Sequence, residues 1–161
     1  MKTILYSIKP EYMNLILSGN KTVELRKRVP TLQKNDKILL YASSPQKALV
    51  GIIEVLDVFI EPIERLWIRA SNTACIDFET FRNYYLGKDS GVGIVLQKPK
   101  KFLNPISLED LRTHWRGFSP PQDYRYVTLE NNQNKSTKTK MGTTQPVILE
   151  TRAQNEYLIR F

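Results

Sequence analysis

The sequence has few of the residues that form covalent cross-links and soft metal sites. It contains a single cysteine, Cys75, and a single histidine, His114, among its 161 residues. One cysteine excludes an internal disulfide, and one histidine leaves too few ligands for a Cys/His zinc site. We therefore expect neither a metal nor a redox cofactor.

Long apolar stretches are also missing. No run approaches the ~20 residues that span a bilayer. The first ten residues carry an early lysine and lack the long apolar segment and the small-residue cleavage site of a secretion signal. The sequence therefore predicts a cytoplasmic protein without a membrane partner.

Acidic residues are outnumbered by basic ones. There are 24 Lys and Arg against 16 Asp and Glu, which gives a formal net charge of +8. A surplus of this size favours anionic partners, although it does not determine a fold. Apolar residues make up 41% of the chain, enough for one packed domain of ordinary size.

Apolar periodicity predicts short strands with helices between them. Strands are expected at residues 3–8, 22–28, 37–42, 49–60, 91–96 and 124–129, and helices at 10–18, 62–70, 78–86 and 108–114. Gly51 interrupts the longest apolar run, as in a strand that bends sharply in a small barrel. Residues 98–101 are expected to form a basic turn around Pro99. This order favours a small α+β barrel over an alternating parallel sheet.

The composition changes near residue 131. Residues 131–145 contain no large apolar residue except Met141, which predicts a flexible polar linker or a surface loop. Residues 146–161 regain strand-like hydrophobicity. We expect a domain over residues 1–130 and a C-terminal extension that either pairs back onto it or docks on a protein partner.

The turn and strand after the first predicted helix carry the densest charge. With the strand period of two, Glu24 and Arg26 share one face, and Val23 and Leu25 share the other. The apolar pair then faces the core, and the charged pair faces a groove or solvent. The turn places Lys21 at the mouth of the same groove. A solvated charged face on an edge strand is the simpler alternative.

The same segment contains a G-x-K-x-x-E-x-R pattern at Gly19, Lys21, Glu24 and Arg26. This is the signature of ASCH domains, so the chain resembles that family of the PUA-like superfold. The resemblance covers roughly residues 2–128, and residues 81–87 and 120–126 are similar to a branch described as transcriptional regulators. It implies a small PUA-like β-barrel with flanking helices and a basic cleft that binds RNA or a nucleotide.

Within such a cleft, the side chains expected to bind the ligand are Lys9, Lys21, Glu24, Arg26, Tyr41, Ser43 and Ser44. The cations neutralise phosphate, and the planar fork of Arg26 makes two-point contacts. Glu24 accepts a hydrogen bond from a base or holds Arg26, and Tyr41 offers a stacking surface. Of the adjacent Tyr84 and Tyr85, one ring is expected to face the core and the other the outside.

Enzymatic activity is the alternative. Some compact ASCH relatives resemble this chain at the same motif but hydrolyse N4-acylated cytidines with a lysine, a threonine and a distant glutamate. Lys21 matches the lysine, whereas Glu24 stands at the threonine position. Another ASCH relative is described as a ribonuclease. In either hydrolase Lys21 and Glu24 would be the catalytic pair, provided that burial lowers the pKa of the lysine.

A regulatory or protein-interaction module is the third class, with the C-terminal extension as the recruiting element. No segment shows a helix-turn-helix with a basic second helix, so sequence-specific DNA recognition is the weaker form of this hypothesis.

Overall fold

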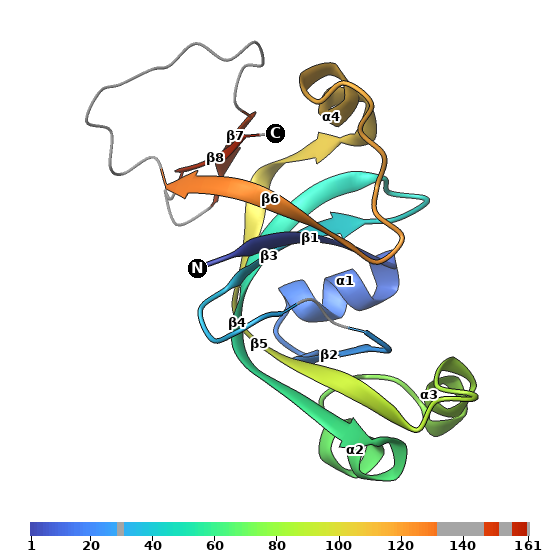
Figure 1. Cartoon of the computed structure of the whole chain (residues 1–161). Helices are drawn as coiled ribbons and strands as arrows, with labels where there is room; N and C mark the ends of the chain where they lie inside the picture. Colours follow the sequence, from blue (N-terminus) through green and yellow to red (C-terminus); the bar gives the residue numbers. More distant parts are fainter. Residues whose placement is uncertain (29–30, 132–146, 152–155, 161) are drawn as a thin grey trace.

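A curved β-sheet organises the computed structural model, which describes residues 1–28, 31–131, 147–151 and 156–160 (Figure 1). Its strands are β1 (Thr3–Ile8), β2 (Val23–Arg26), β3 (Lys37–Ala42), β4 (Ala48–Pro62), β5 (Ser90–Ser107), β6 (Tyr124–Asn131), β7 (Val147–Glu150) and β8 (Glu156–Arg160). The helices are α1 (Pro10–Leu17), α2 (Ile63–Ala70), α3 (Phe78–Tyr84) and α4 (Leu108–His114). Within the described residues, none of these helices has the length and apolar character to cross a membrane.

The strand order is β2-β5-β4-β3-β1-β6-β8-β7. β1 and β3 run parallel, and the other neighbouring strands pair antiparallel. β2 and β7 are the two edges, and no ladder of hydrogen bonds joins them in the part of the chain that the structure describes. The fold is therefore a mixed α/β arrangement on an open sheet, and the predicted closed barrel is not confirmed.

The central strands are buried on both faces, which explains their uninterrupted apolar sequence. In β1, Ile4 and Tyr6 point into one apolar cluster, whereas Leu5 points into another on the opposite face. β3 repeats the alternation, since Leu40 belongs to the first cluster and Tyr41 to the second. The two strands are in register, with Tyr6 opposite Leu40.

α1 lies in the concave side of the sheet, between β1 and β2 (Figure 1). Pro10 begins the helix, where its missing N–H costs nothing, and Met13 and Ile16 pack into the first apolar cluster. Gly19 ends the turn that follows with a φ of +81°, a conformation that favours glycine. This turn directs the chain from α1 into β2.

α2 and α3 cover the far ends of β2, β4 and β5. Leu66 of α2 and Phe81 of α3 form a third apolar cluster with Val23 and Leu25 of β2. Asp77 caps α3, because its side chain accepts a hydrogen bond from the backbone N–H of Thr80. The apolar face of β2 is thereby fixed against the helices, as the alternation predicts.

β5 is much longer than the predicted strand at residues 91–96. It continues to Ser107 through residues 98–101, for which the sequence predicts a basic turn. Lys98 has a φ of +52°, and the register with β4 shifts at several points, including between Ile52 and Glu54. These irregularities let the strand bend and continue where Pro99 and the lysines suggest a stop.

The C-terminal strands extend the sheet beyond β6. β8 pairs with β6, and β7 pairs with β8 at the edge. Leu149, Tyr157 and Ile159 are buried in the second apolar cluster, together with Leu111 of α4. The predicted linker at 131–145 lies almost entirely outside the described residues.

Gly93 of β5 allows a testable prediction about packing. An added Cβ there would lie 2.2 Å from Cζ of Phe59, so Gly93→Ala is overpacked. We expect this substitution to lower the free energy of unfolding by about 1–3 kcal/mol in urea denaturation. The double variant with Phe59→Leu should recover part of the loss. An unchanged midpoint in the single variant would contradict the close approach of the two residues.

Candidate ligand-binding site

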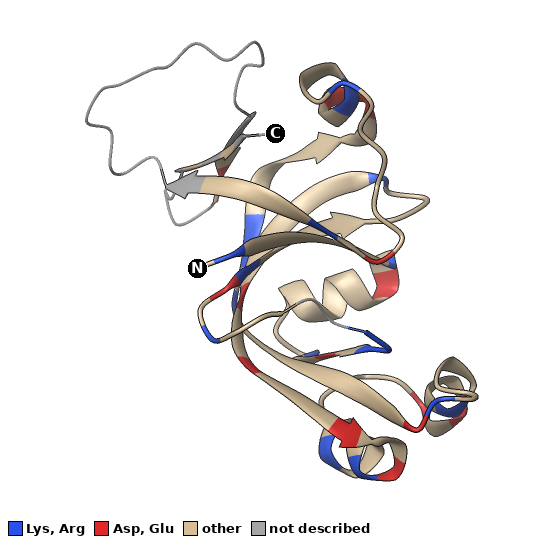
Figure 2. Cartoon of the chain, in the orientation of Figure 1, with Lys and Arg blue, Asp and Glu red and all other residues tan. Residues whose placement is uncertain are grey.

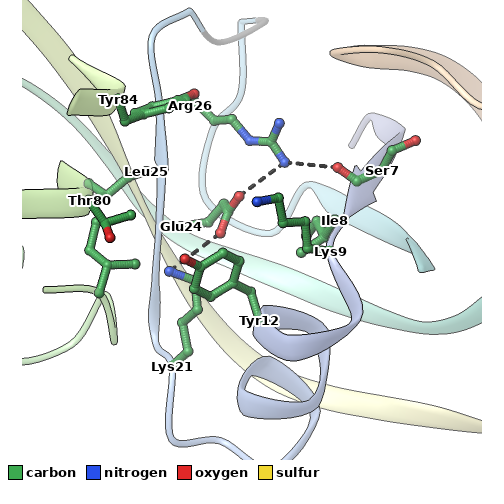
Figure 3. A pocket seen from close by; sticks show the side chains of 11 residues that line it. Ser7, Ile8, Lys9, Tyr12, Lys21, Glu24, Leu25, Arg26, Thr80 and Tyr84 are labelled. Carbon is green, nitrogen blue, oxygen red and sulfur yellow. Dashed lines mark hydrogen bonds and ion pairs between the residues drawn. The ribbon is translucent and has the colours of Figure 1, made fainter. Parts of the chain in front are cut away.

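A cavity of about 240 Å³ lies between the start of α1, the strand β2 and the helix α3 (Figure 3). It is lined by Ser7, Ile8, Lys9, Tyr12, Lys21, Glu24, Leu25, Arg26, Ile76, Thr80 and Tyr84. The cavity is smaller than the ~300–1,000 Å³ of typical drug-sized pockets, so it has room for one base or one phosphate-bearing group. Figure 2 shows basic segments along β2 and in the loop that follows it.

Lys21 is the most deeply buried charge of the site, with 3% of its surface exposed. Its backbone N–H donates to the carbonyl of Leu15 in α1, which fixes the turn. Its ammonium donates to the carbonyl of Ala74, which belongs to the α2–α3 connection. The ammonium also lies 5.4 Å from the centre of the Tyr12 ring, within cation–π range. Contacts from two segments, α1 and the α2–α3 connection, therefore hold Lys21 in place.

Glu24 is shared by two cations. One carboxylate oxygen lies 3.5 Å from Nζ of Lys21, and the other lies 3.0 Å from Nη2 of Arg26. Glu24 is only 8% exposed, so these pairs are shielded from water. The predicted charged face of β2 is thus buried in a cavity, and the alternative of a solvated charged face is wrong.

Arg26 is held on three sides. Besides Glu24, its Nη2 donates to the carbonyl of Ser7 in β1 over 3.3 Å. Its guanidinium carbon lies 4.3 Å from the centre of the Tyr6 ring, and its own carbonyl accepts a hydrogen bond from the hydroxyl of Tyr85. The planar group is thereby fixed before any ligand arrives.

Burial shifts the proton equilibria of the site. It lowers the pKa of Lys21 below the ordinary value of 10.5, while the Glu24 carboxylate acts in the opposite direction. Burial also raises the pKa of Tyr12 and of Tyr84, so both phenols are neutral at physiological pH. Lys21 is therefore a cation that gives up its proton more readily than a surface lysine.

The mouth of the cavity is lined by exposed groups. Lys9 is exposed at the N-cap of α1, where no side chain caps the helix. The Tyr84 side chain is 38% exposed, and Nζ of Lys27 lies 4.8 Å from the centre of its ring. Tyr85 packs in the core, so the expected inward and outward orientation of the two tyrosines is confirmed. A flat aromatic ring and two cations thus surround the opening.

The structure brings together four of the seven predicted ligand-binding residues and leaves three elsewhere. Lys9, Lys21, Glu24 and Arg26 line the cavity, whereas Tyr41, Ser43 and Ser44 do not. Tyr41 packs in the second apolar cluster, with its ring centre 6.2 Å from that of Phe118. Ser43 and Ser44 follow β3, outside the cavity lining.

Sequence patterns do not assign the aromatic and hydroxyl side chains of the helices to the site. The pattern of α1 places Tyr12 in the core, yet the side chain is half-buried and lines the cavity. Thr80 of α3 also lines it. The adjacent Tyr84 and Tyr85 predict one outward ring, but nothing in the sequence directs that ring toward β2.

Fold and site together define an α/β domain with a small charged cavity between its first helix and an edge strand. The comparisons with known proteins agree with this description, because the ASCH domain model matches residues 7–112. The chain belongs to the ASCH domain family. No comparison supports the narrower assignment to a branch of transcriptional regulators.

Among curated proteins, the chain is similar to an ASCH domain-containing ribonuclease of Zymomonas mobilis. The two are 29% identical over 132 residues, which cover 82% of this chain and 88% of that protein. It is also similar to the large ribosomal subunit protein uL22 of Ureaplasma parvum, with 30% identity over 110 residues. That match covers 68% of this chain but 35% of the ribosomal protein.

Solved structures of the Zymomonas mobilis ASCH protein have the same fold. One superposes with a TM-score of 0.73 and 29% identity, covering 79% of this chain and 88% of that one. A tyrosine-to-phenylalanine variant gives a TM-score of 0.74 at 28% identity, covering 80% and 91%.

Proposed function

We propose that the chain binds single-stranded RNA or a nucleotide, with the base or the phosphate of one nucleotide in the cavity beside Lys21, Glu24 and Arg26. The observation that carries this proposal is the combination of buried cations with tyrosine rings in a space the size of one base. Base stacking on an aromatic ring contributes about 1–3 kcal/mol per base, and cations attract the backbone. The ribonuclease relative supports RNA as the class of ligand.

Single-stranded ligands fit the site better than duplexes. A base reaches a cavity of about 240 Å³ only when it is unpaired and unstacked from its neighbours. The net charge of +8 and the exposed Lys9 and Lys27 near the opening then act on the flanking backbone. The regulatory role and the protein partner of the C-terminal strands stay predictions without support from the comparisons.

Fluorescence anisotropy with an end-labelled single-stranded RNA tests the proposal. We expect Arg26→Gln to weaken binding by at least about tenfold, or ~1.4 kcal/mol, because a charged hydrogen-bond donor is lost from a shielded site. Lys34→Gln removes the same charge from an exposed loop outside the cavity lining, so it is the matched control. Equal affinities of the two variants would refute the assignment of binding to this cavity.

RNA cleavage in the same cavity is the second candidate. Two observations favour it: the relative described as a ribonuclease, and the lowered pKa of Lys21. A neutral Lys21 would take the proton of a ribose 2′-hydroxyl as its oxygen attacks phosphorus and the bond to the 5′-oxygen breaks. The departing 5′-oxygen then takes a proton from water, so the products are a 2′,3′-cyclic phosphate and a 5′-hydroxyl.

Incubation with RNA followed by chromatography separates binding from cleavage. Cyclic-phosphate products that disappear in Lys21→Met would establish the ribonuclease. Binding without products would leave the chain as an RNA-binding protein. N4-acetylcytidine in a parallel incubation tests the amidohydrolase hypothesis, for which the glutamate at position 24 replaces the expected threonine.

A further inference from the structure

The charges that line the cavity do not balance. Three cations line it, namely Lys9, Lys21 and Arg26, whereas Glu24 is the one carboxylate in the lining that the structure describes. Glu24 already pairs with both Lys21 and Arg26. One of these two shielded positive charges is therefore left without a full counter-charge, and exposed Lys9 adds another at the mouth. Such an excess favours an anion in the cavity.

Arg26 has donor capacity that the protein does not use. Its Nε is buried and has no hydrogen-bond partner within the described residues. Its Nη2 is occupied by Glu24 and by the carbonyl of Ser7, and the stacked Tyr6 ring restrains the plane. Buried donors normally have a partner, so the unpaired Nε–H of this cavity-lining residue points to an acceptor that a ligand supplies.

The first turn of α1 adds to the same preference. Lys9 and Tyr12, which flank this turn, both line the cavity, and the helix has no side-chain cap. The helix dipole and the free N–H groups of this turn favour negative charge at this end, although Pro10 has no N–H and Glu11 already supplies one carboxylate. The helix alone would not define a site, but here it lies across the cavity from a fixed guanidinium (Figure 3).

We infer that the cavity accepts a phosphate group of the nucleotide beside Arg26, with Lys9 closing on it from the mouth. This inference rests on the proposed function and names the part of the ligand that enters. Because Nη2 is already occupied, Arg26 offers the phosphate the unpaired Nε–H rather than a two-point fork, and a tetrahedral anion has acceptors left for Lys9. The phosphate is either a terminal monoester or an internal diester of RNA, and a dinucleotide without a terminal phosphate distinguishes the two.

Isothermal titration calorimetry with small probes tests the inference on the unmodified chain. We expect cytidine 5′-monophosphate to bind at least about tenfold more tightly than cytidine, a difference of ~1.4 kcal/mol. The dinucleotide CpC without a terminal phosphate separates the sources. If CpC binds as tightly as the monophosphate, the bound group is an internal diester. If CpC binds only as tightly as cytidine, the bound group is a terminal monoester. Equal binding of cytidine, the monophosphate and CpC overturns the inference.

Variants and modified RNA give an independent measurement. Arg26→Lys keeps the charge but removes the Nε–H donor, and we expect it to lose most of the advantage of the monophosphate over cytidine, whereas Lys34→Gln keeps that advantage. With RNA, loss of one phosphate contact should reduce the slope of log affinity against log salt by about 0.7. A neutral methylphosphonate at the contacted position should have the same effect.

These outcomes separate the inference from the proposed function. If RNA binding depends on Arg26 but is unaffected by methylphosphonates at every position and by a terminal phosphate, the cavity binds a base and the phosphate assignment fails. If inorganic phosphate and the monophosphate bind at Arg26 while RNA binding does not depend on it, the anion site stands and the RNA proposal fails.

Discussion

Glu24→Gln is expected to lower the free energy of unfolding by about 3–5 kcal/mol, the usual cost of removing one partner from a buried ion pair. The substitution preserves shape and removes only the negative charge. Lys21 and Arg26 would then share a shielded cavity without the carboxylate that lies 3.5 Å from one and 3.0 Å from the other. For a chain of this length the melting temperature should fall by roughly 6–20 °C.

Glu54→Gln is the matched control for this prediction. Glu54 pairs with Lys98 over 3.0 Å, a distance equal to that of the Glu24–Arg26 pair, but the side chains of the lysine and the glutamate are 63% and 21% exposed, against 13% and 10% for Arg26 and Glu24. Exposed pairs contribute about 0–1 kcal/mol, so the control should change stability little. Urea denaturation of both variants measures the difference. Similar losses of unfolding free energy in the two variants would show that the buried ion pairs of Glu24 stabilise the fold no more than the Glu54 pair does.

Local patterns in the sequence predict most of the helices and strands, but they do not predict whether the sheet closes into a barrel. The ranges of β1 and β3 are predicted to the residue, because dense β-branched and aromatic runs end at clear breaks. The extension of β5 to Ser107 depends on pairing with β4, which overrides the local turn signals at Lys98 and Pro99. Closure of a barrel likewise depends on long-range pairing, which strand patterns do not specify.

The same contrast between local patterns and long-range packing explains which site residues the sequence predicts. The period of two in β2 correctly places Glu24 and Arg26 on one face, because a single face of that strand is apolar. β3 is apolar on both faces, so its sequence has no alternation to show that Tyr41 points away from the cavity. The position of Tyr84 depends on how α3 packs against β2, which is a property of the assembled fold.

Lys21 leads to a prediction about pH. Because burial lowers its pKa in the folded chain, Lys21 loses its proton there at a pH at which the unfolded chain still holds it. The unfolded state then binds more protons, so folding stability gains with rising pH between the lowered pKa and 10.5. Relative to Lys21→Met, the wild-type chain should become more stable across this window by up to about 1.4 kcal/mol per pH unit.

Urea denaturation of both chains at a series of pH values up to 10 measures this difference. The buried Tyr6 and Tyr85, whose pKa values are raised by burial, destabilise the fold at higher pH, but they are common to both chains and cancel. A stability difference that shrinks with rising pH would mean that Glu24 outweighs burial and raises the pKa of Lys21.

Anion binding should show the reverse trend, because a phosphate in the cavity favours the protonated lysine. Affinity for cytidine 5′-monophosphate is therefore expected to fall in the same window in which the free chain becomes more stable. A pH-independent affinity would place the phosphate out of reach of Lys21.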